Sequence, residues 1–224
     1  REESPEVVLT VSDESGNVGR RVTGPATAGF HRVAWDLRYP PADPTDLTPA
    51  PTNDPFSDPP IGPMAAPGRY SVSLAVRADG TLTPLGERQS FQAQPLGRAS
   101  LPARDSAAAL EFERKTARLQ RAVLATSRLV RDTRGHLALV KKAVDDAPKA
   151  DAKLMQDVRT LDGRLRDLQV ALDGDAVVRR YNAPVLPGIV ERVQGVIGST
   201  WTSTSAPTAT ARQQYLIASE LFEP

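Results

Sequence analysis

The chain has 224 residues, of which 40 % are hydrophobic and 25 % are charged, enough for one large or two small domains with apolar cores. Its formal net charge of +1 argues against a general nucleic-acid binder, because such proteins neutralise many phosphates with cationic side chains. It has no cysteine, which excludes disulfides and thiolate sites, and no apolar run of about 18 residues that would predict a membrane span.

Alternating apolar residues between positions 5 and 95 predict short strands, each with one buried face. Val33, Trp35 and Leu37 fall on one side of an extended chain, and the charged neighbours fall on the other. The alternation returns over residues 70–76. These two runs are the clearest strand predictions in the chain.

Turn-forming residues separate the predicted strands. Ser15-Gly16-Asn17 can reverse the chain between the first two strands, and Asp79-Gly80 is typical of a two-residue hairpin. Five or more short strands with such turns favour an antiparallel sandwich. The sequence therefore predicts an immunoglobulin-like β-sandwich over residues 1–98, without the cysteine pair of immunoglobulins.

A proline-rich stretch at residues 40–67 interrupts the sandwich. Proline fixes φ and removes a backbone donor, so we expect a long loop here. Its acids surround Phe56 without the spacing or glycine of a calcium-binding EF-hand: Asp43, Asp46, Asp54 and Asp58. The favoured interpretation is a solvated or surface-packed loop, ahead of a partner contact and a metal site.

After Pro102 the apolar residues follow one another in steps of three and four, as on one face of a helix. This first seam comprises Phe112, Thr116, Leu119, Val123, Thr126, Val130, Thr133, Leu137, Val140 and Val144. It predicts a helix near residues 105–145, with Gly135 inside it. We expect Asp146 to cap a second helix near residues 148–173, with Pro148 in its first turn. The second seam comprises Leu154, Val158, Leu161, Leu165, Leu168 and Leu172.

Two further helices are predicted near residues 187–201 and 206–222. Their apolar faces are formed by Ile189, Val193, Val196 and Thr200, and by Ala211, Tyr215, Ala218 and Phe222. Ser205, followed by Ala206-Pro207, is the expected cap of the last helix. The sequence thus predicts an α+β multidomain chain in which residues 103–224 form an antiparallel helical bundle of three to four helices.

The first helix also carries a basic face, comprising Arg114, Lys115, Arg118, Arg121, Arg128, Arg131, Arg134, Lys141 and Lys142. We favour its solvation and its pairing with acids of the second helix (Asp157, Asp162 and Asp167) over the docking of an acidic partner. The seams themselves fit an intramolecular bundle or an oligomer. Threonines inside the first seam favour the intramolecular bundle.

Side chains suited to catalysis are few. His31 and His136 lie in different predicted domains with no metal-ligand spacing, so packing or exposure is favoured over ligation. We expect Asp36 to fix the end of the Trp35 strand by accepting backbone or arginine hydrogen bonds. No nucleotide-binding glycine motif or nucleophile elbow occurs, so the sequence predicts no catalytic residue, metal or cofactor.

Two runs resemble a known module. They are Gly29 to Pro40 (G-F-H-R-V-A-W-D-L-R-Y-P) and Ala66 to Val72 (A-P-G-R-Y-S-V), which resemble the immunoglobulin-like module of the flagellar hook-capping protein. The fuller likeness is to the C-terminal region of large bacterial proteins with sortilin-like, BNR-type propellers, often labelled glycosyl hydrolases. There a helical segment follows the sandwich, and the run 203–208 is similar to the start of its last helix. Leu37-Arg38 and the proline-rich loop depart from the hook-capping pattern and agree with the propeller-associated one.

The resemblance implies a noncatalytic accessory region that packs on or positions an upstream propeller of the same polypeptide, in a secreted or periplasmic bacterial protein. The opening residues Arg1-Glu2-Glu3-Ser4-Pro5, without an initiator methionine, also lead us to expect a piece of a longer chain. No catalytic position carries over, so any enzymatic activity of the parent protein stays open.

Two alternative functions remain: a glycan-binding or substrate-assisting part of a glycoside hydrolase, and an oligomerisation scaffold that uses the helical seams. For a partner or glycan contact the candidates are aromatic: Tyr39, Phe56, Tyr181 and Trp201. Exposed rings would support this alternative, because aromatic faces stack on other rings and on apolar surfaces.

Overall fold

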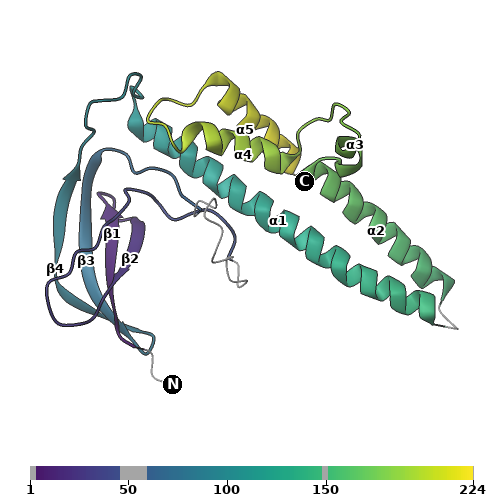
Figure 1. The fold of residues 1–224 in the computed structure, drawn as a ribbon, viewed down its shortest axis with the longest axis horizontal. Helices are drawn as coiled ribbons and strands as arrows, with labels where there is room; N and C mark the ends of the chain where they lie inside the picture. The colour runs from purple at the N-terminus through teal and green to yellow at the C-terminus, as the bar shows by residue number, and fades with distance from the viewer. Residues whose placement is uncertain (1–3, 46–59, 148–150, 224) are drawn as a thin grey trace. The chain divides into compact units, whose positions relative to one another are not determined.

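A computed structural model describes residues 4–45, 60–147 and 151–223. Within them lie a four-stranded antiparallel sheet and, after it, five helices (Figure 1). The predicted α+β class is therefore confirmed. The chain divides into two compact units, which are described separately. The first comprises Arg1–Pro41, Asp58–Arg114 and Trp201–Ala206, and the second comprises Ala42–Ser57, Lys115–Thr200 and Pro207–Pro224.

The sheet belongs to the first unit. Its strands are β1 (Glu6–Asp13), β2 (Val18–Gly24), β3 (Gly68–Ala78) and β4 (Thr81–Ala93), in the spatial order β2-β1-β3-β4 (Figure 1). Each neighbouring pair is antiparallel. Leu9 pairs with Val22 on one side and Leu74 on the other, and Leu74 in turn pairs with Leu85. A row of apolar side chains therefore crosses one face of the sheet.

Both predicted turns are confirmed. Between β1 and β2, the N–H of Gly16 donates to the Asp13 carbonyl at 3.0 Å, and the N–H of Asn17 donates to the Asp13 carboxylate at 2.9 Å. Asp79 and Gly80 join β3 to β4 with φ of 48° and 75°. Two successive left-handed residues make a type I′ turn, whose twist matches that of the flanking strands.

The Trp35 segment is not a strand of this sheet, contrary to the prediction. Val33 and Trp35 are half-buried as expected, whereas Leu37, predicted on the same buried side, is 46 % exposed. The Trp35 ring lies edge-on to Tyr70 and Phe91, with centroids 5.4 and 6.2 Å apart. Backbone pairing is limited to one isolated bridge between Arg38 and Met64. The alternating pattern therefore reflects the packing of side chains against the sheet. It does not reflect a ladder of backbone hydrogen bonds.

Leu37 and Asp36 explain where this extended segment ends. Leu37 has φ of 57°, a left-handed conformation that interrupts any strand. The Asp36 carboxylate accepts the N–H of Arg38 at 3.1 Å and lies 3.9 Å from the Arg20 guanidinium. The structural role predicted for Asp36 is confirmed, although it fixes a bend rather than a strand end.

The helices are α1 (Ser106–Asp146), α2 (Ala152–Asp173), α3 (Ala176–Arg180), α4 (Ile189–Thr200) and α5 (Ala209–Phe222). Four of them lie close to the predicted ranges. The short α3 was not predicted, since five residues are too few for a periodic pattern. It begins at Asp175, whose carboxylate accepts the N–H groups of Val177 and Val178.

Two predicted helix caps are wrong. Asp146 lies at the end of α1, where its carboxylate accepts from Lys142 at 2.6 Å, and α2 is capped by Asp151 instead. The Ser205 hydroxyl donates to the Leu101 carbonyl, and Thr208 caps α5. In each case the predicted residue has another hydrogen-bond partner. The expected proline in the first turn of the second helix, Pro148, lies outside the described residues.

The buried face of α1 differs by one residue from the predicted seam. Half of the seam is buried as predicted: Thr116, Val123, Val130, Leu137 and Val144. A buried polar residue lies three positions before each of Thr116, Val123 and Val130. These polar residues are Glu113, Gln120 and Ser127. The predicted positions one residue before these, Phe112, Leu119 and Thr126, are only partly buried. The helix therefore buries a polar stripe beside its apolar one.

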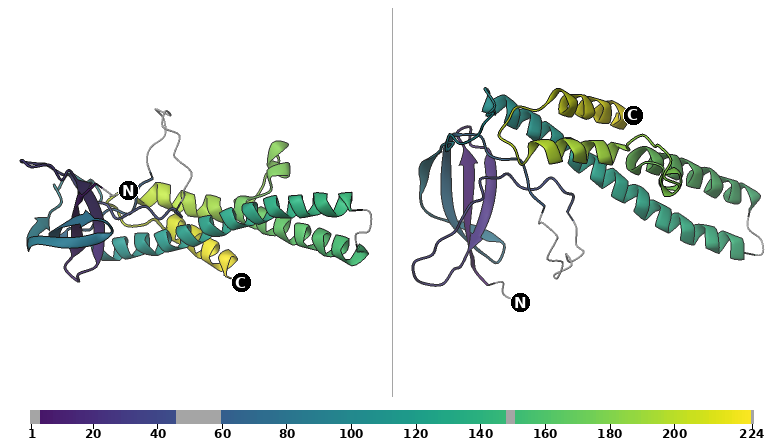
Figure 2. Two further views of the ribbon diagram at one scale, coloured as in Figure 1. Left: turned by 90° about the horizontal axis from the view of Figure 1, so that it is seen from below. Right: turned by 45° about the horizontal axis from the view of Figure 1, so that its top comes forward.

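The second unit has one apolar core to which four helices contribute. It comprises Val123, Val130, Leu137, Val158, Leu165, Leu172, Ile189, Val193 and Ala218. α2 lies alongside α1 in the opposite direction in Figures 1 and 2. The faces predicted for α4 and α5 are confirmed, with Phe222 partly buried against the core. Every second member of the α2 seam, in contrast, stays 43–50 % exposed: Leu154, Leu161 and Leu168.

Gly135 lies in the middle of α1, where an added Cβ would meet nothing within 4 Å. We predict that Gly135→Ala raises the free energy of unfolding by about 1 kcal/mol, because alanine has the higher helix propensity. Urea denaturation followed by circular dichroism measures the change. Gly188→Ala is the contrasting variant, since its Cβ would lie 2.6 Å from backbone atoms of Leu172 and Gly174, and it should lower stability. A destabilised Gly135→Ala would contradict the open space beside that residue.

Candidate functional site

The aromatic candidates lie in different settings. Tyr39 and Trp201 belong to the first unit, where only 7 % and 2 % of their surfaces are exposed. Tyr181 follows α3 in the second unit and is 78 % exposed. Phe56 lies outside the described residues. A glycan or partner contact stays a prediction, and Tyr181 is the described candidate whose ring a ligand reaches without rearrangement.

Neither histidine belongs to a metal-binding cluster in the described part of the chain. His31 is exposed, with Nε2 2.7 Å from the Thr27 carbonyl, and His136 is exposed on α1. Over residues 4–45, 60–147 and 151–223, no three His, Asp or Glu side chains lie where they could hold one ion. No described helix combines the length and apolarity needed to cross a bilayer.

Arg38 joins three segments of the first unit. Its Nη1 donates to the Gly62 carbonyl at 3.1 Å and to the Trp201 carbonyl at 2.8 Å. The Trp35 indole N–H donates to the Arg38 carbonyl at 3.0 Å. The buried environments of Tyr39 and Trp201 are thus linked through the residue that precedes Tyr39.

Tyr39 and Tyr70 form a polar cluster with Arg114 and Asp13. The Arg114 guanidinium lies 4.4 Å from the centre of the Tyr39 ring and 3.4 Å from the Asp13 carboxylate. Burial raises the pKa of Tyr70 to about 12 and also raises the pKa of Tyr39. Burial opposes ionisation of Asp13, but hydrogen bonds from Asn17 and Arg114 lower its pKa overall. Neutral phenols beside an ionised carboxylate make this cluster structural rather than reactive.

The basic face of α1 makes contacts within the second unit. Arg121 and Arg128 donate to the carbonyls of Ala42 and Thr45. The predicted pairing with Asp162 is confirmed, since Arg134 lies 4.0 Å from its carboxylate. Asp157, in contrast, pairs with Lys153 of its own helix at 2.8 Å. The arginines named here therefore have partners, and they do not form a free cationic patch.

A hollow beside α3 contains further arginines. It has a volume of about 680 Å³ and includes Arg134, Arg166 and Arg179. Arg166 pairs with Asp162 at 2.9 Å and Arg179 with Glu191 at 3.1 Å. Arg134, Arg166 and Arg179 therefore already have acidic partners, and Arg180 also lines the hollow.

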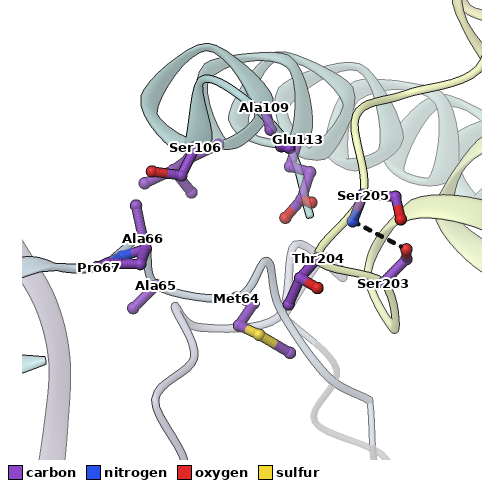
Figure 3. Close-up of a pocket in the computed structure, with 12 residues that line it drawn as sticks. Met64, Ala65, Ala66, Pro67, Ser106, Ala109, Glu113, Ser203, Thr204 and Ser205 are labelled. Carbon is purple, nitrogen blue, oxygen red and sulfur yellow. Dashed lines mark hydrogen bonds between the residues drawn. The ribbon is translucent and has the colours of Figure 1, made fainter. Parts of the chain in front are cut away.

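A small cavity lies among three segments of the first unit, namely the start of α1, residues 64–67 and residues 203–205 (Figure 3). Its volume is about 60 Å³. Small apolar side chains form much of its wall: Ala65, Ala66, Pro67, Ala103, Ala109 and Leu110. The carboxylate of Glu113 points into it from α1 (Figure 3).

Glu113 is a buried acid with an unfilled hydrogen-bonding position. Only 5 % of the residue is exposed, and no donor among the described residues reaches its Oε2. Burial raises the pKa of Glu113 to about 7, although a hydrogen bond from the Met64 N–H and the charge of Arg38 act in the opposite direction. Both protonation states are therefore populated near neutral pH.

Two serines complete the polar side of the cavity. The Ser205 hydroxyl donates to the Leu101 carbonyl at 2.6 Å, and the Ser205 N–H donates to the Ser203 hydroxyl at 3.1 Å (Figure 3). A serine hydroxyl has one proton, so Ser205 has only lone pairs left for a ligand. Ser205 and the Glu113 carboxylate therefore offer acceptors to a hydrogen-bond donor, and Ser106 and Thr204 line the same cavity.

An apolar groove of about 510 Å³ lies on the sheet of the first unit. β1 and β3 contribute Val7, Leu9 and Leu74, and the segment after β2 contributes Phe30 and Val33. The Phe30 side chain is fully exposed at the groove. We call this feature the Phe30 groove. It is built partly by the Gly29 to Pro40 run.

The sequence did not single out Glu113 as a site residue. The predicted seam placed its neighbour Phe112 in the core instead. The signal in the sequence was the seven-residue spacing of Glu113, Gln120 and Ser127. Each of these residues lies three positions before a buried seam residue, and therefore beside it on the helix surface. Such a polar stripe is easily taken for a solvent-exposed face, because surface helices normally carry polar residues on the side that faces water.

Comparison with known proteins leaves the family open. No family model, no curated protein and no solved structure matched the chain.

The raised pKa of Glu113 predicts a pH dependence of stability. A glutamate in the unfolded chain loses its proton near pH 4.5, whereas folded Glu113 keeps it up to about pH 7. Between these values the folded state binds more protons, so the free energy of unfolding falls as the pH rises and levels off above that range. Glu113→Gln should remove a pH dependence on the order of 3 kcal/mol, measured by urea denaturation at several pH values.

Glu111→Gln is the matched control for this measurement, because Glu111 lies on the exposed side of the same helical turn. It should retain the pH profile of the wild-type protein. Parallel profiles for the wild-type protein and Glu113→Gln would show that the Glu113 carboxyl is not desolvated in solution.

Proposed function

We propose that this chain is a noncatalytic accessory region of a larger secreted bacterial protein, in which it packs on or positions a β-propeller of the same polypeptide. The observation that carries the proposal is the Phe30 groove. Residues 30–33, which belong to the run that resembles propeller-associated modules, line this groove. The segment that carries the resemblance therefore also contributes to an apolar candidate for a docking surface in the first unit.

The proposal includes a finer description of the fold. The sheet and the Trp35 segment would correspond to the immunoglobulin-like sandwich, and the four long helices to an antiparallel bundle. Edge-on packing of Trp35 against Tyr70 and Phe91 supports the first correspondence, because it covers one face of the sheet. The common core of α1, α2, α4 and α5 supports the second.

The energetics favour a protein surface as the occupant of the groove. Transferring a fully exposed phenylalanine out of water contributes about 1.5–3 kcal/mol. The groove places Phe30 beside Val7, Leu9 and Leu74, so a matching apolar side chain would bury several residues together. His31 and Arg32 supply polar groups among the lining residues, as at the rim of many interfaces.

Phe30→Ala tests the proposal in the longer polypeptide that includes the preceding domain. We expect this chain to melt at a higher temperature in the longer polypeptide than alone, because docking stabilises it. Phe30→Ala should remove about 2 kcal/mol of that stabilisation. It should leave the melting of the isolated chain unchanged, since the side chain is fully exposed there.

Leu96→Ala is the matched control. Leu96 is 88 % exposed, lies in the first unit and does not line the groove. It should leave the stabilisation intact. Independent unfolding of the two parts of the longer polypeptide, with no mutual stabilisation, would contradict the proposal.

Oligomerisation through α2 is a second candidate function. Leu154, Leu161 and Leu168 repeat every seven residues and remain 46 %, 43 % and 50 % exposed. This spacing forms a continuous stripe along one helix face, as in coiled coils. Sedimentation equilibrium should then show self-association that Leu161→Lys abolishes. A monomer at high concentration would contradict this candidate.

A further inference from the structure

We infer that the Glu113 cavity binds a primary alkylammonium group, such as the end of a lysine side chain or a free alkylamine. The inference is separate from the proposed propeller docking, because the cavity and the Phe30 groove share no lining residue. It rests on the charge, the size and the wall chemistry of the cavity.

The first argument is the missing partner of the carboxylate. A buried carboxylate is costly unless it is paired and hydrogen-bonded. Oε2 of Glu113 has no donor among the described residues, and the carboxyl accepts from the Met64 N–H. Arg38 contributes its charge, but its Nη1 donates to the carbonyls of Gly62 and Trp201. A cationic donor at Oε2 would complete the site.

The second argument is size. The cavity has a volume of about 60 Å³. By this measure one water molecule needs about 10–15 Å³, so there is room for roughly four non-hydrogen atoms. An ammonium nitrogen with three methylene carbons has that number. A quaternary ammonium group is bulkier and lacks an N–H donor.

The third argument is the wall. Alanine, proline and leucine side chains surround the space beside Glu113, and Ser205 offers an acceptor. Methylene groups suit such walls, as when a lysine stem lies along apolar surface. A hydrated metal ion would leave these walls unmatched, because hard cations require several oxygen ligands.

An anion does not fit the same space. The Glu113 carboxylate would repel it, and two N–H groups in the first turn of α1, those of Ala108 and Ala109, already have acceptors. Asp105 accepts the N–H of Ala108 through its carboxylate at 2.9 Å and the N–H of Ala109 through its carbonyl at 3.2 Å. The start of α1 therefore offers these donors to its cap and not to a ligand.

Binding should depend on pH through Glu113. Alkylammonium groups stay charged to about pH 10, so ionisation of the carboxyl controls the interaction near neutral pH. Arg38 is the charged group that acts on Glu113. Affinity should therefore rise with pH through about 7 and become constant above it.

Titration of the full chain with n-butylamine at about pH 8 tests the inference by isothermal calorimetry. We expect saturable binding to one site, and at least roughly tenfold weaker binding at about pH 5.5, where Glu113 is protonated. Butan-1-ol and potassium chloride are the matched ligands, one without the charge and the other without the alkyl chain. Equal binding of either one, or no saturable binding of butylamine, would overturn the inference.

Variants locate the binding site. Glu113→Gln should abolish butylamine binding, Ala109→Leu should weaken it by filling the cavity, and Glu111→Gln should leave it unchanged. Carboxyl NMR of the wild-type protein adds a readout that needs no variant, since bound butylamine should lower the pKa of Glu113. An unchanged Glu113 pKa at saturation would overturn the inference even if a variant fails to fold.

The source of the alkylammonium group is distinguished by a second ligand, Nα-acetyl-lysine amide. Tighter binding than butylamine would indicate a lysine of a polypeptide, because the ligand then also gains contacts through its backbone. Weaker binding would indicate a free alkylamine. Both results support the site, whereas failure of both ligands to bind overturns it.

Discussion

One guanidinium group holds together the first unit of this protein. Nη1 of Arg38 donates to the carbonyl of Gly62 and to that of Trp201, which lies 163 residues further along the chain. Hydrogen bonds from charged donors are stronger than neutral ones, and a buried carbonyl left unpaired is costly. The Trp35 indole adds a bond to the Arg38 backbone. Arg38 thus connects three segments of the first unit, and its charge acts on Glu113.

Much of the fold could be predicted because local patterns dominate it. The Asp79-Gly80 pair determines its own turn, and the faces of α4 and α5 follow from spacing alone. The Trp35 segment shows the limit of such patterns. Alternation records which side chains are buried, but a ladder also needs a neighbouring strand in register, and Leu37 turns the chain before one can form.

The candidate sites were harder to predict for a related reason. The sequence identified the run that contributes to the Phe30 groove, but not that Phe30 would be exposed, because exposure depends on the packing of β1 and β3. Glu113 was harder still. Its burial follows from a one-residue rotation of the α1 face, which brings Glu113, Gln120 and Ser127 inward together. The pattern favoured the neighbouring stripe of Phe112, Leu119 and Thr126, because its residues are the less polar ones.

The first unit contains segments that are far apart in the sequence, and this affects how it folds during synthesis. Its last segment is Trp201–Ala206, and the Thr204 carbonyl and Ser205 hydroxyl bond to residues 103 and 101 just before α1. A ribosome releases the strands β1 to β4 long before it adds these residues. The first unit therefore lacks its last segment while α1 to α4 are synthesised, although all four strands of the sheet are already present. Contacts so distant in sequence slow folding and lengthen the time during which apolar surface is available to chaperones or to aggregation.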